Sequence, residues 1–430
     1  MRTFFRGIHP KDRKERTAGC ALEKMPAPDK LYVNLAQHAG APAEAVVAVG
    51  DSVKCGTLIG RAQGFISANV HSPVSGKVTA LVKQPSASGI KTLHVEIEND
   101  GLYDEDFLPP LENPAKEDIL ARVKDAGIAG MGGAAFPLFV KLSPKETIDT
   151  LIVNGVECEP YITCDYRIML ERTEEVARGI ALVKAASGAA NAIIGIEANK
   201  AEAAKKLAAV LPPDIKVVLL KTKYPQGAEK QLIYALTRRR VPAGGLPAAV
   251  GVTVLNIQTA LAVCEAVEKG RPPIMRAVTV SGGGVEHAGN YYVYTGTPYK
   301  FIYDNLKGNA EEDAVAKILS GGPMMGMAQS DLSASVVKGT SALLFLTDAE
   351  ISERPMTQCI NCASCHKCCP MNLMPMVFES LYEQGEFASV KAAGVLNCIE
   401  CGACSYVCPA KRPLVQVIRL TKKTIKEKGI

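Results

Sequence analysis

The residues with the most recognisable chemistry are eight cysteines near the carboxyl end of the chain. They form two runs with the same spacing, C-x2-C-x2-C-x3-C-P, which begin at Cys359 and Cys398. In bacterial proteins with two [4Fe–4S] clusters, this spacing places the first three cysteines on one cluster and the fourth on the other. The sequence therefore predicts one cluster held by Cys359, Cys362, Cys365 and Cys408, and a second held by Cys398, Cys401, Cys404 and Cys369.

A further cysteine, Cys368, lies beside these ligands but outside their register. Its neighbour Cys369 is the predicted ligand, because only Cys369 precedes a proline at the matching distance. We expect Cys368 to be a small buried hydrophobic residue. Paired zinc sites also use C-x2-C spacing, but the duplicated run with its terminal prolines favours iron–sulfur clusters.

The composition is that of a globular protein. The chain has 430 residues, 47% hydrophobic and 22% charged, with a net charge of +5, which indicates several domains and no nucleic-acid partner. No apolar run reaches the ~18–20 residues that cross a bilayer. No apolar stretch of ~7–15 residues follows the basic start, so a secretory signal is not expected. Basic residues gather at both ends, where we expect solvated surfaces or a contact with an anionic partner.

Hydrophobic patterns predict a multidomain α/β protein with four segments. Residues 1–112 contain short alternating runs between turn signals, and two stretches resemble the halves of an N-terminal lipoyl-like barrel-sandwich; no lysine sits at a hairpin tip, so we expect a structural or docking module. Residues 113–274 alternate helices with buried strands, which predicts a Rossmann-like parallel sheet. Residues 275–348 are predicted to form a β-grasp domain, and residues 349–430 a helical, ferredoxin-like two-cluster domain.

Glycine and polar residues collect where the strands of the parallel sheet are predicted to end. A glycine-rich loop precedes the sheet, and glycine allows a backbone to approach a flat ring or a phosphate closely. Three later loops follow predicted strands, at the edge where ligands of open parallel sheets bind. Thr259 is placed as an N-cap-like hydroxyl that would meet a phosphate. The candidate residues of these loops are Gly130, Gly132, Gly133, Asn154, Glu157, Glu159, Tyr224, Gly227, Glu229, Asn256 and Thr259.

Two of these loops carry motifs of a known family. Asn154 begins the run N-x-x-E-x-E-P and Tyr224 begins the run Y-x-x-G-x-E. Together with the glycine loop, these runs resemble the flavin- and NADH-binding subunit of respiratory complex I. With the segment that starts at "GIHP" ahead of them and two cysteine runs behind, the whole chain resembles the C subunit of the Rnf ion-translocating ferredoxin:NAD oxidoreductase.

The resemblance implies a peripheral subunit on the cytoplasmic face of the cell membrane, which binds FMN and NAD(H) and exchanges electrons with its two clusters. Other subunits of an Rnf-type complex would be its partners and would provide its membrane contact, and ferredoxin would be an indirect partner. Glu157 and Glu159 would be the catalytic residues. The flavin would lie against Gly130, Gly132, Gly133, Lys141, Asn154 and Glu157, its phosphate against Asn256 and Thr259, and the nicotinamide nucleotide against Glu159 and Glu229, with Tyr224 and Gly227 as further cofactor-binding positions.

Four positions depart from the family pattern. Ala135 and Leu138 stand in the glycine loop where glycine and threonine are usual, Ala363 replaces a glycine in the first cysteine run, and Ala228 replaces an acid of the complex I motif. Two alternative functions stay open. A cobalamin-reducing flavoprotein of a bacterial microcompartment has the same order of domains but typically lacks the first segment. A non-catalytic electron-wire subunit would bind no flavin.

Overall fold

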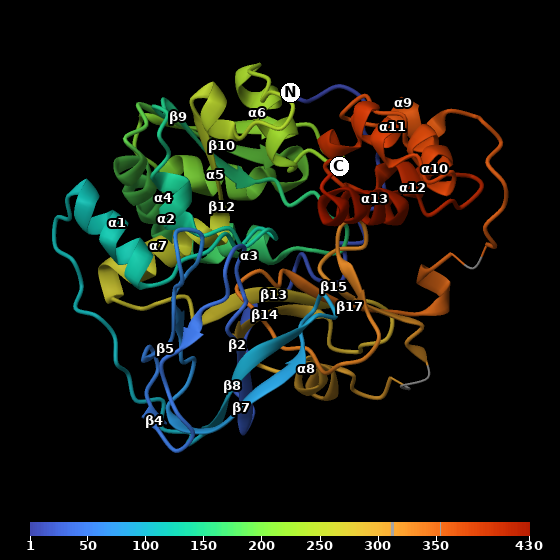
Figure 1. Ribbon diagram of the computed structural model, residues 1–430. Helices are drawn as coiled ribbons and strands as arrows, with labels where there is room; N and C mark the ends of the chain where they lie inside the picture. The colour runs from blue at the N-terminus through green and yellow to red at the C-terminus, as the bar shows by residue number, and fades with distance from the viewer. Residues whose placement is uncertain (311–313, 353) are drawn as a thin grey trace.

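A four-stranded parallel sheet with helices on both faces forms the middle of the chain (Figure 1). In the computed structural model, which describes residues 1–310, 314–352 and 354–430, its strand order is β11-β10-β9-β12 and every pair is parallel. The predicted parallel sheet is therefore present. We call this part the α/β unit; its strands are β9 (Thr150–Gly155), β10 (Asn191–Glu197), β11 (Ile215–Leu220) and β12 (Val252–Asn256). Its helices are α1 (Lys116–Asp125), α2 (Leu138–Leu142), α3 (Cys164–Glu171), α4 (Thr173–Ser187), α5 (Ala201–Val210), α6 (Glu229–Thr237) and α7 (Ile257–Lys269).

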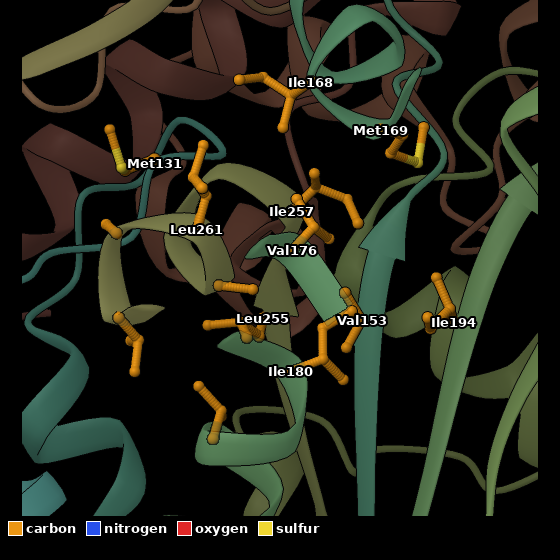
Figure 2. Close-up of a cluster of buried hydrophobic side chains, with 14 of the residues drawn as sticks. Met131, Val153, Ile168, Met169, Val176, Ile180, Ile194, Leu255, Ile257 and Leu261 are labelled. Carbon is orange, nitrogen blue, oxygen red and sulfur yellow. The ribbon is translucent and has the colours of Figure 1, made fainter. Parts of the chain in front are cut away.

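The strands of this sheet are apolar on both faces, because helices cover both. Val153 of β9 and Leu255 of β12 pack in one core with residues of α4 and α7, as Figure 2 shows. Ile152, which points to the other face, packs with Leu232 and Leu236 of α6 in a second core. Successive residues of a strand point to opposite faces, so a strand buried on both sides must be continuously apolar.

The strand order reverses between β9 and β12. The chain passes from β9 to β10 to β11 in one direction along the sheet and then returns to place β12 on the other side of β9. Crevices at such reversals, beyond the carboxyl ends of the strands, are the usual ligand sites of open parallel sheets. Asn154 and Asn256 are register partners in the last rung of the β9–β12 pair, so they lie where such a crevice is expected. We call this place the crevice.

The segment ahead of the α/β unit forms two small antiparallel sheets around a common core. Their strand orders are β2-β8-β7-β4 and β3-β5-β6. Leu31, Ile59, Val78 and Ile97 are fully buried between them. We call this part the barrel unit; its strands are β2 (Lys30–Asn34), β3 (Glu44–Ala45), β4 (Ser52–Val53), β5 (Leu58–Arg61), β6 (Val70–His71), β7 (Gly76–Pro85) and β8 (Lys91–Asn99).

A six-stranded mixed sheet follows the α/β unit, with the order β1-β14-β13-β17-β15-β16. Its edge strand β1 comes from the start of the chain and pairs with β14 in parallel, so this part of the predicted segment 1–112 lies outside the barrel unit. The four domain boundaries and the β-grasp assignment stay predictions. The elements of this mixed-sheet unit are β1 (Leu22–Lys24), β13 (Met275–Ser281), β14 (Gly289–Tyr294), α8 (Tyr299–Leu306), β15 (Lys317–Ser320), β16 (Met327–Gln329) and β17 (Ala342–Leu346).

The carboxyl-terminal part, which we call the cysteine unit, is helical. Phe378, Val390, Ile418 and Ile425 form its small apolar core. Its helices are α9 (Ser364–Cys368), α10 (Pro375–Glu383), α11 (Phe387–Ala392), α12 (Ala403–Val407) and α13 (Leu414–Lys428). Among the described residues, no helix combines the length and the apolar character needed to span a bilayer.

The first 21 residues form a strap that crosses three of these units. The backbone of Gly7 donates to the carbonyl of Cys368 in the cysteine unit, and Ile8 pairs with Tyr224 of the α/β unit. Arg16 donates to the carbonyls of Gly282 and Val285 in the mixed-sheet unit. The expectation of a solvated basic surface is wrong for Lys14, which is only 8% exposed, whereas Arg16 is exposed as well as hydrogen-bonded.

The close packing of α4 against α7 leads to a prediction about stability. A Cβ atom on Gly179 of α4 would lie 2.0 Å from the carbonyl oxygen of Ala260 on α7. We expect Gly179→Ala to force these helices apart at a cost of about 1–3 kcal/mol, reduced by up to about 1 kcal/mol by the better helix propensity of alanine. Thermal unfolding followed by circular dichroism should show a lower melting temperature.

Gly19→Ala is the matched control, because a Cβ there would meet nothing within 4 Å. It should melt like the wild type. An unchanged melting temperature for Gly179→Ala would show that α4 and α7 are not packed backbone to backbone.

Candidate functional site

The eight cysteines of the two runs line two separate cavities. Helices α9 and α12, one from each run, pack against each other, and this packing brings the fourth cysteine of each run to the other. The first cavity is lined by Cys359, Cys362, Cys365 and Cys408, and the second by Cys369, Cys398, Cys401 and Cys404. The structure thus brings together the residues of each predicted ligand set. Cys368 lines neither cavity; it is buried, as expected, and its thiol donates to the carbonyl of Cys365.

The backbone follows the same path in both runs. Asn361 and Ala363 of the first run have positive φ angles of 54° and 57°, and Glu400 and Gly402 of the second have 55° and 74°. Left-handed residues at these places fold the short links so that successive thiols face one point. Ala363 has a left-handed backbone conformation that glycine adopts more readily. Its departure from the family's glycine therefore falls at a position that favours glycine.

The donors in each cavity suit an iron–sulfur cluster. Four thiols face each cavity, and thiolates are the ligands of such clusters. In the second cavity the backbone N–H groups of Leu373 and Glu400 donate to the sulfurs of Cys369 and Cys398, both at 3.3 Å. Hydrogen bonds of this kind to sulfur are one of the features that set the reduction potential of a bound cluster.

The two cavities differ in their surroundings. Cys359 and Cys362 of the first are exposed, whereas Cys369, Cys401 and Cys404 of the second are buried. The second cavity adjoins the α/β unit, because the hydroxyl of Tyr224 donates to the carbonyl of Cys401 at 2.6 Å. The second cavity therefore faces the parallel sheet, and the first faces solvent.

The glycine loop, residues 127–137, lies over the crevice between β9 and β12. A Cβ atom on Gly132 would come within 3.1 Å of the Cβ of Asn256, so a larger residue here would have to push Asn256 aside by a few tenths of an ångström. The N–H of Met131 donates to the hydroxyl of Thr259 at 2.9 Å, and the N–H of Gly130 to the carbonyl of Phe136. Within the described part of the chain, the N–H groups of Gly132 and Gly133 make no hydrogen bond.

One prediction about the start of α7 is wrong. The N-cap of this helix is Asn256, whose side-chain oxygen accepts from the N–H of Gln258 at 2.9 Å. Thr259 lies inside the first turn and is fully buried, so its hydroxyl anchors the glycine loop. The sequence pattern located the helix start to within a few residues but not the residue that caps it.

Asn256 also links the crevice to a buried acid. Its side-chain N–H donates to Asp165 at 2.7 Å, and Gln258 donates to the other oxygen of the same carboxylate at 2.8 Å. No sequence pattern singled out Asp165, although it follows the N-x-x-E-x-E-P run by only five residues. On β9, the side chain of Asn154 donates to the carbonyl of Gly227, which ties the third loop to the sheet.

Glu157 is a buried acid with one oxygen left over. The N–H of Asp165 donates to Oε1 at 2.6 Å, while Oε2 has no hydrogen-bond partner in the described part of the chain and lies 3.9 Å from the ammonium group of Lys14. Burial raises the pKa of Glu157 to about 7, against the opposing effect of the Lys14 charge. Its φ of 47° is a left-handed conformation that a side chain rarely adopts, so the surrounding structure must hold it.

Two buried lysines provide that support. Lys14 donates to the carbonyl of Glu157 at 2.9 Å, and Lys200 donates to the carbonyl of Val156 at 2.8 Å. Burial lowers the pKa of Lys200 to about 8. The sequence offered no signal for Lys14, because it lies 143 residues from Glu157.

Glu159 lies where three units meet. Its carboxylate accepts from the N–H of Met324 in the mixed-sheet unit at 3.1 Å, and the hydroxyl of Tyr224 lies 3.4 Å away. Burial raises the pKa of Glu159 to about 7. Met324 in turn packs on Gly402 beside the second cavity. Glu159 is therefore linked to the cysteine unit through Met324 and Tyr224, and its contact with a nicotinamide nucleotide stays a prediction.

Lys141 and Glu229 are brought together by α2 and α6. Their side chains form an ion pair of 2.7 Å that is partly exposed. The family resemblance assigns them to different parts of the cofactors, and in the structure each is the partner of the other. An exposed pair of this kind contributes little to stability, so both side chains remain available to a ligand.

Family models match three parts of the chain. The matches are an RnfC barrel sandwich hybrid domain over residues 2–102, a Nuo51 FMN-binding domain over residues 123–265 and a 4Fe-4S dicluster domain over residues 358–426. They confirm the predicted barrel-sandwich, flavin-domain and iron–sulfur segments at this level of detail. The structure of an NAD+-reducing [NiFe]-hydrogenase in the air-oxidised state is similar in fold over 70% of this chain and 63% of the matched chain, with a TM-score of 0.52 at 20% identity.

Relatives match along nearly the whole chain. The chain is 43% identical to the C subunit of the proton-translocating ferredoxin:NAD(+) oxidoreductase complex of Clostridium ljungdahlii, over 98% of its own length and 94% of the relative. It is 43% identical to the C subunit of the ion-translocating oxidoreductase complex of Rhodobacter capsulatus, over 98% and 83%. It is 40% identical to the C subunit of the Na(+)-translocating ferredoxin:NAD(+) oxidoreductase complex of Acetobacterium woodii, over 98% and 97%. The chain therefore belongs to the family of C subunits of ion-translocating oxidoreductase complexes.

Proposed function

We propose that this chain is the FMN- and NAD(H)-binding subunit of a membrane-bound, ion-translocating ferredoxin:NAD oxidoreductase, and that it transfers electrons between a flavin and two [4Fe–4S] clusters. The observation that carries this proposal is the crossed sorting of eight cysteines into two cavities, one of which is joined to the α/β unit through Tyr224. High identity to C subunits over nearly the whole chain favours this function over a cobalamin-reducing flavoprotein.

The clusters are assigned to the two cavities. Cys359, Cys362, Cys365 and Cys408 hold one, and Cys398, Cys401, Cys404 and Cys369 hold the other. The buried second cavity adjoins the α/β unit, so its cluster is the one nearer the flavin. The first cavity carries exposed cysteines, so its cluster is the one that exchanges electrons with another subunit of the complex.

The flavin is assigned to the crevice under the glycine loop. A bound flavin can exchange a hydride with a nicotinamide and single electrons with a cluster. The chain's part is to bind and orient it: the unpaired N–H groups of Gly132 and Gly133 are donors for a polar edge or phosphate of the cofactor. Asn154 and Asn256 form the floor, Gly130 and Thr259 shape the loop, and Lys141, Glu229 and Gly227 lie on the neighbouring loops.

Glu157 is proposed to hold and release a proton, and Glu159 is proposed to contact the nicotinamide nucleotide. A carboxyl group whose pKa is near 7 can hold or release a proton at ordinary pH. In Glu157 that proton would sit on Oε2, the oxygen that has no hydrogen-bond partner among the described residues. Glu159, beside Tyr224, is proposed to contact the nicotinamide nucleotide and to keep the cysteine unit in place.

The protein is proposed to lie on the cytoplasmic face of the membrane and to reach it through partner subunits. The described residues contain no helix able to span a bilayer, and the relatives carry the names of subunits of larger complexes. Ferredoxin would then be reached indirectly, by way of those partners.

The proposal as a whole is tested on protein purified without oxygen. About eight iron atoms and one FMN per chain are expected, and NADH should bleach both the flavin absorbance near ~450 nm and the broad iron–sulfur absorbance. Iron without flavin would reduce the chain to an electron wire. Zinc in place of iron would contradict the assignment of the cavities.

The crossed ligation predicts different effects for two thiols of the cysteine unit. Cys408→Ala should remove the first cluster and lower the iron content from about eight to about four atoms per chain, because its sulfur completes the first cavity. Cys368→Ala is the matched control, since that thiol lines neither cavity, and its iron content should be unchanged. Equal iron contents in the two variants would refute the crossed arrangement.

The raised pKa of Glu157 predicts a pH effect. Glu157→Gln should slow NADH oxidation at least ten-fold while iron content stays the same, and the inflection of the wild-type pH profile near pH 7 should disappear. Because the folded-state pKa of Glu157 lies above its ordinary value, the contribution of Glu157 to wild-type stability falls as the pH rises from about 4.5 to 7. The variant lacks this loss, so its melting temperature relative to wild type should rise over that range.

Glu202→Gln serves as the control for this variant. The side chain of Glu202 is 62% exposed on α5, and its loss should change neither the rate nor the pH profile. Normal NADH oxidation by Glu157→Gln would move the reacting centre to another part of the chain.

A further inference from the structure

Two fully buried cations hold the glycine loop from outside the α/β unit. Arg276 lies on β13 and Lys338 shortly before β17, and they are 1% and 2% exposed. The ammonium group of Lys338 donates to the carbonyl of Gly127 at 2.7 Å, and Arg276 donates to the carbonyl of Met131 at 3.2 Å. Arg276 also donates to the carbonyl of Lys338 at 2.6 Å, so the two cations act as one support.

The barrel unit completes this support. Lys338 donates also to the carbonyl of Asn69 at 2.8 Å, and its own N–H donates to the side chain of Gln37 at 3.1 Å. The N–H of Ala39 donates to the carbonyl of Ala135 at 3.0 Å. The glycine loop thus contacts both the barrel unit and the mixed-sheet unit, and three of its carbonyls are bonded to groups of those units.

Stability alone does not explain these cations. In the described part of the chain Lys338 has no carboxylate partner within ion-pair distance, and burial lowers its pKa to about 7. Burying a charge with only carbonyl partners is costly, and apolar side chains in place of buried charges often leave stability unchanged or improve it. The hydrogen bonds that Lys338 donates to Gly127 and Asn69 are therefore better explained by a role in the site that they support.

The geometry of the peptide group supplies that role. The C=O and N–H of one trans peptide point in opposite directions. By holding the carbonyl of Met131, Arg276 therefore turns the N–H of Gly132 away from itself. Gly339, next to Lys338, also approaches this part of the loop, because a Cβ there would lie 3.3 Å from the carbonyl oxygen of Gly133. Gly132 and Gly133 carry the unpaired N–H groups.

We propose that Lys338 and Arg276 are positioning residues. Arg276 holds the carbonyl of Met131 so that the N–H of Gly132 faces the flavin, and Lys338 holds the start of the loop at Gly127 and, through its own carbonyl, Arg276. Neither cation touches the cofactor itself. The inference rests on the proposed function, because it takes FMN as the occupant of the crevice. It also makes the mixed-sheet and barrel units part of the flavin site.

The test is Lys338→Met in the full-length protein with its clusters in place. Methionine fills a similar volume without donating, so the loop should lose its hold at Gly127. FMN added to flavin-stripped protein should bind at least ten-fold more weakly than to the wild type, by the quenching of flavin fluorescence. Without FMN, the amides of residues 127–137 should exchange with deuterium several times faster, while iron content stays the same.

Lys391→Met is the matched control. The ammonium group of Lys391 also donates to a backbone carbonyl, that of Ile430 at 2.8 Å, but at the far end of the chain. Its FMN affinity and the exchange of residues 127–137 should equal those of the wild type.

The outcomes separate this inference from the proposed function. A wild-type chain that binds no FMN defeats the proposed function. If the wild type binds FMN and Lys338→Met binds it equally well with unchanged exchange, the flavin assignment stands and the positioning role is overturned. Should Lys338→Met fail to fold, Lys338→Gln, which keeps a donor, is measured in the same way; failure of both to fold would assign Lys338 to stability alone and likewise overturn the inference.

Discussion

The packing of α9 against α12 is the contact on which the cysteine unit depends. Each of these short helices begins within one cysteine run and ends next to the fourth cysteine of that run. Once they lie side by side, the fourth thiol of each run can only reach the cavity of the other. Neither run has a complete set of four thiols by itself, so the two sites must form together.

The two cavities also differ in which part of the protein they face. Tyr224 reaches from the α/β unit to the carbonyl of Cys401, and Ile8 of the strap packs beside them in a small apolar cluster. Burial raises the pKa of the Tyr224 hydroxyl far above its ordinary value, so the group stays protonated and acts as a permanent donor. The second cavity is therefore fixed against the parallel sheet, while the first opens to solvent.

The crevice of the α/β unit depends on charges that come from elsewhere in the chain. Glu157 keeps its left-handed backbone because Lys14 of the strap and Lys200 bond to the carbonyls around it. Lys338 and Arg276 do the same for the glycine loop. In both places buried cations are bonded to carbonyl groups, and N–H groups and one carboxylate oxygen nearby have no hydrogen-bond partner among the described residues. A site built in this way is poised to accept polar groups of a ligand.

Much of this was visible in the sequence, because it depends on short-range geometry. The spacing of the cysteines predicted two sets of four, and the continuous apolar runs predicted the parallel sheet, since both follow from how a few consecutive residues must fold. The pattern also identified the loops at the strand ends. It named Thr259 as a cap where Asn256 serves, because neighbouring polar residues at a helix start are alternatives that only hydrogen bonding decides.

Tertiary structure decided which distant residues share a site. Lys14, Lys338 and Arg276 lie in segments whose patterns predict only a basic tail and strands, and each becomes buried against a carbonyl more than 140 residues away. The place of Glu159 beside Met324 and Tyr224 was likewise set by the meeting of three units. Local spacing determines the path of a short backbone segment. The partner of a buried charge depends on how whole units pack, and no short stretch of sequence specifies that packing.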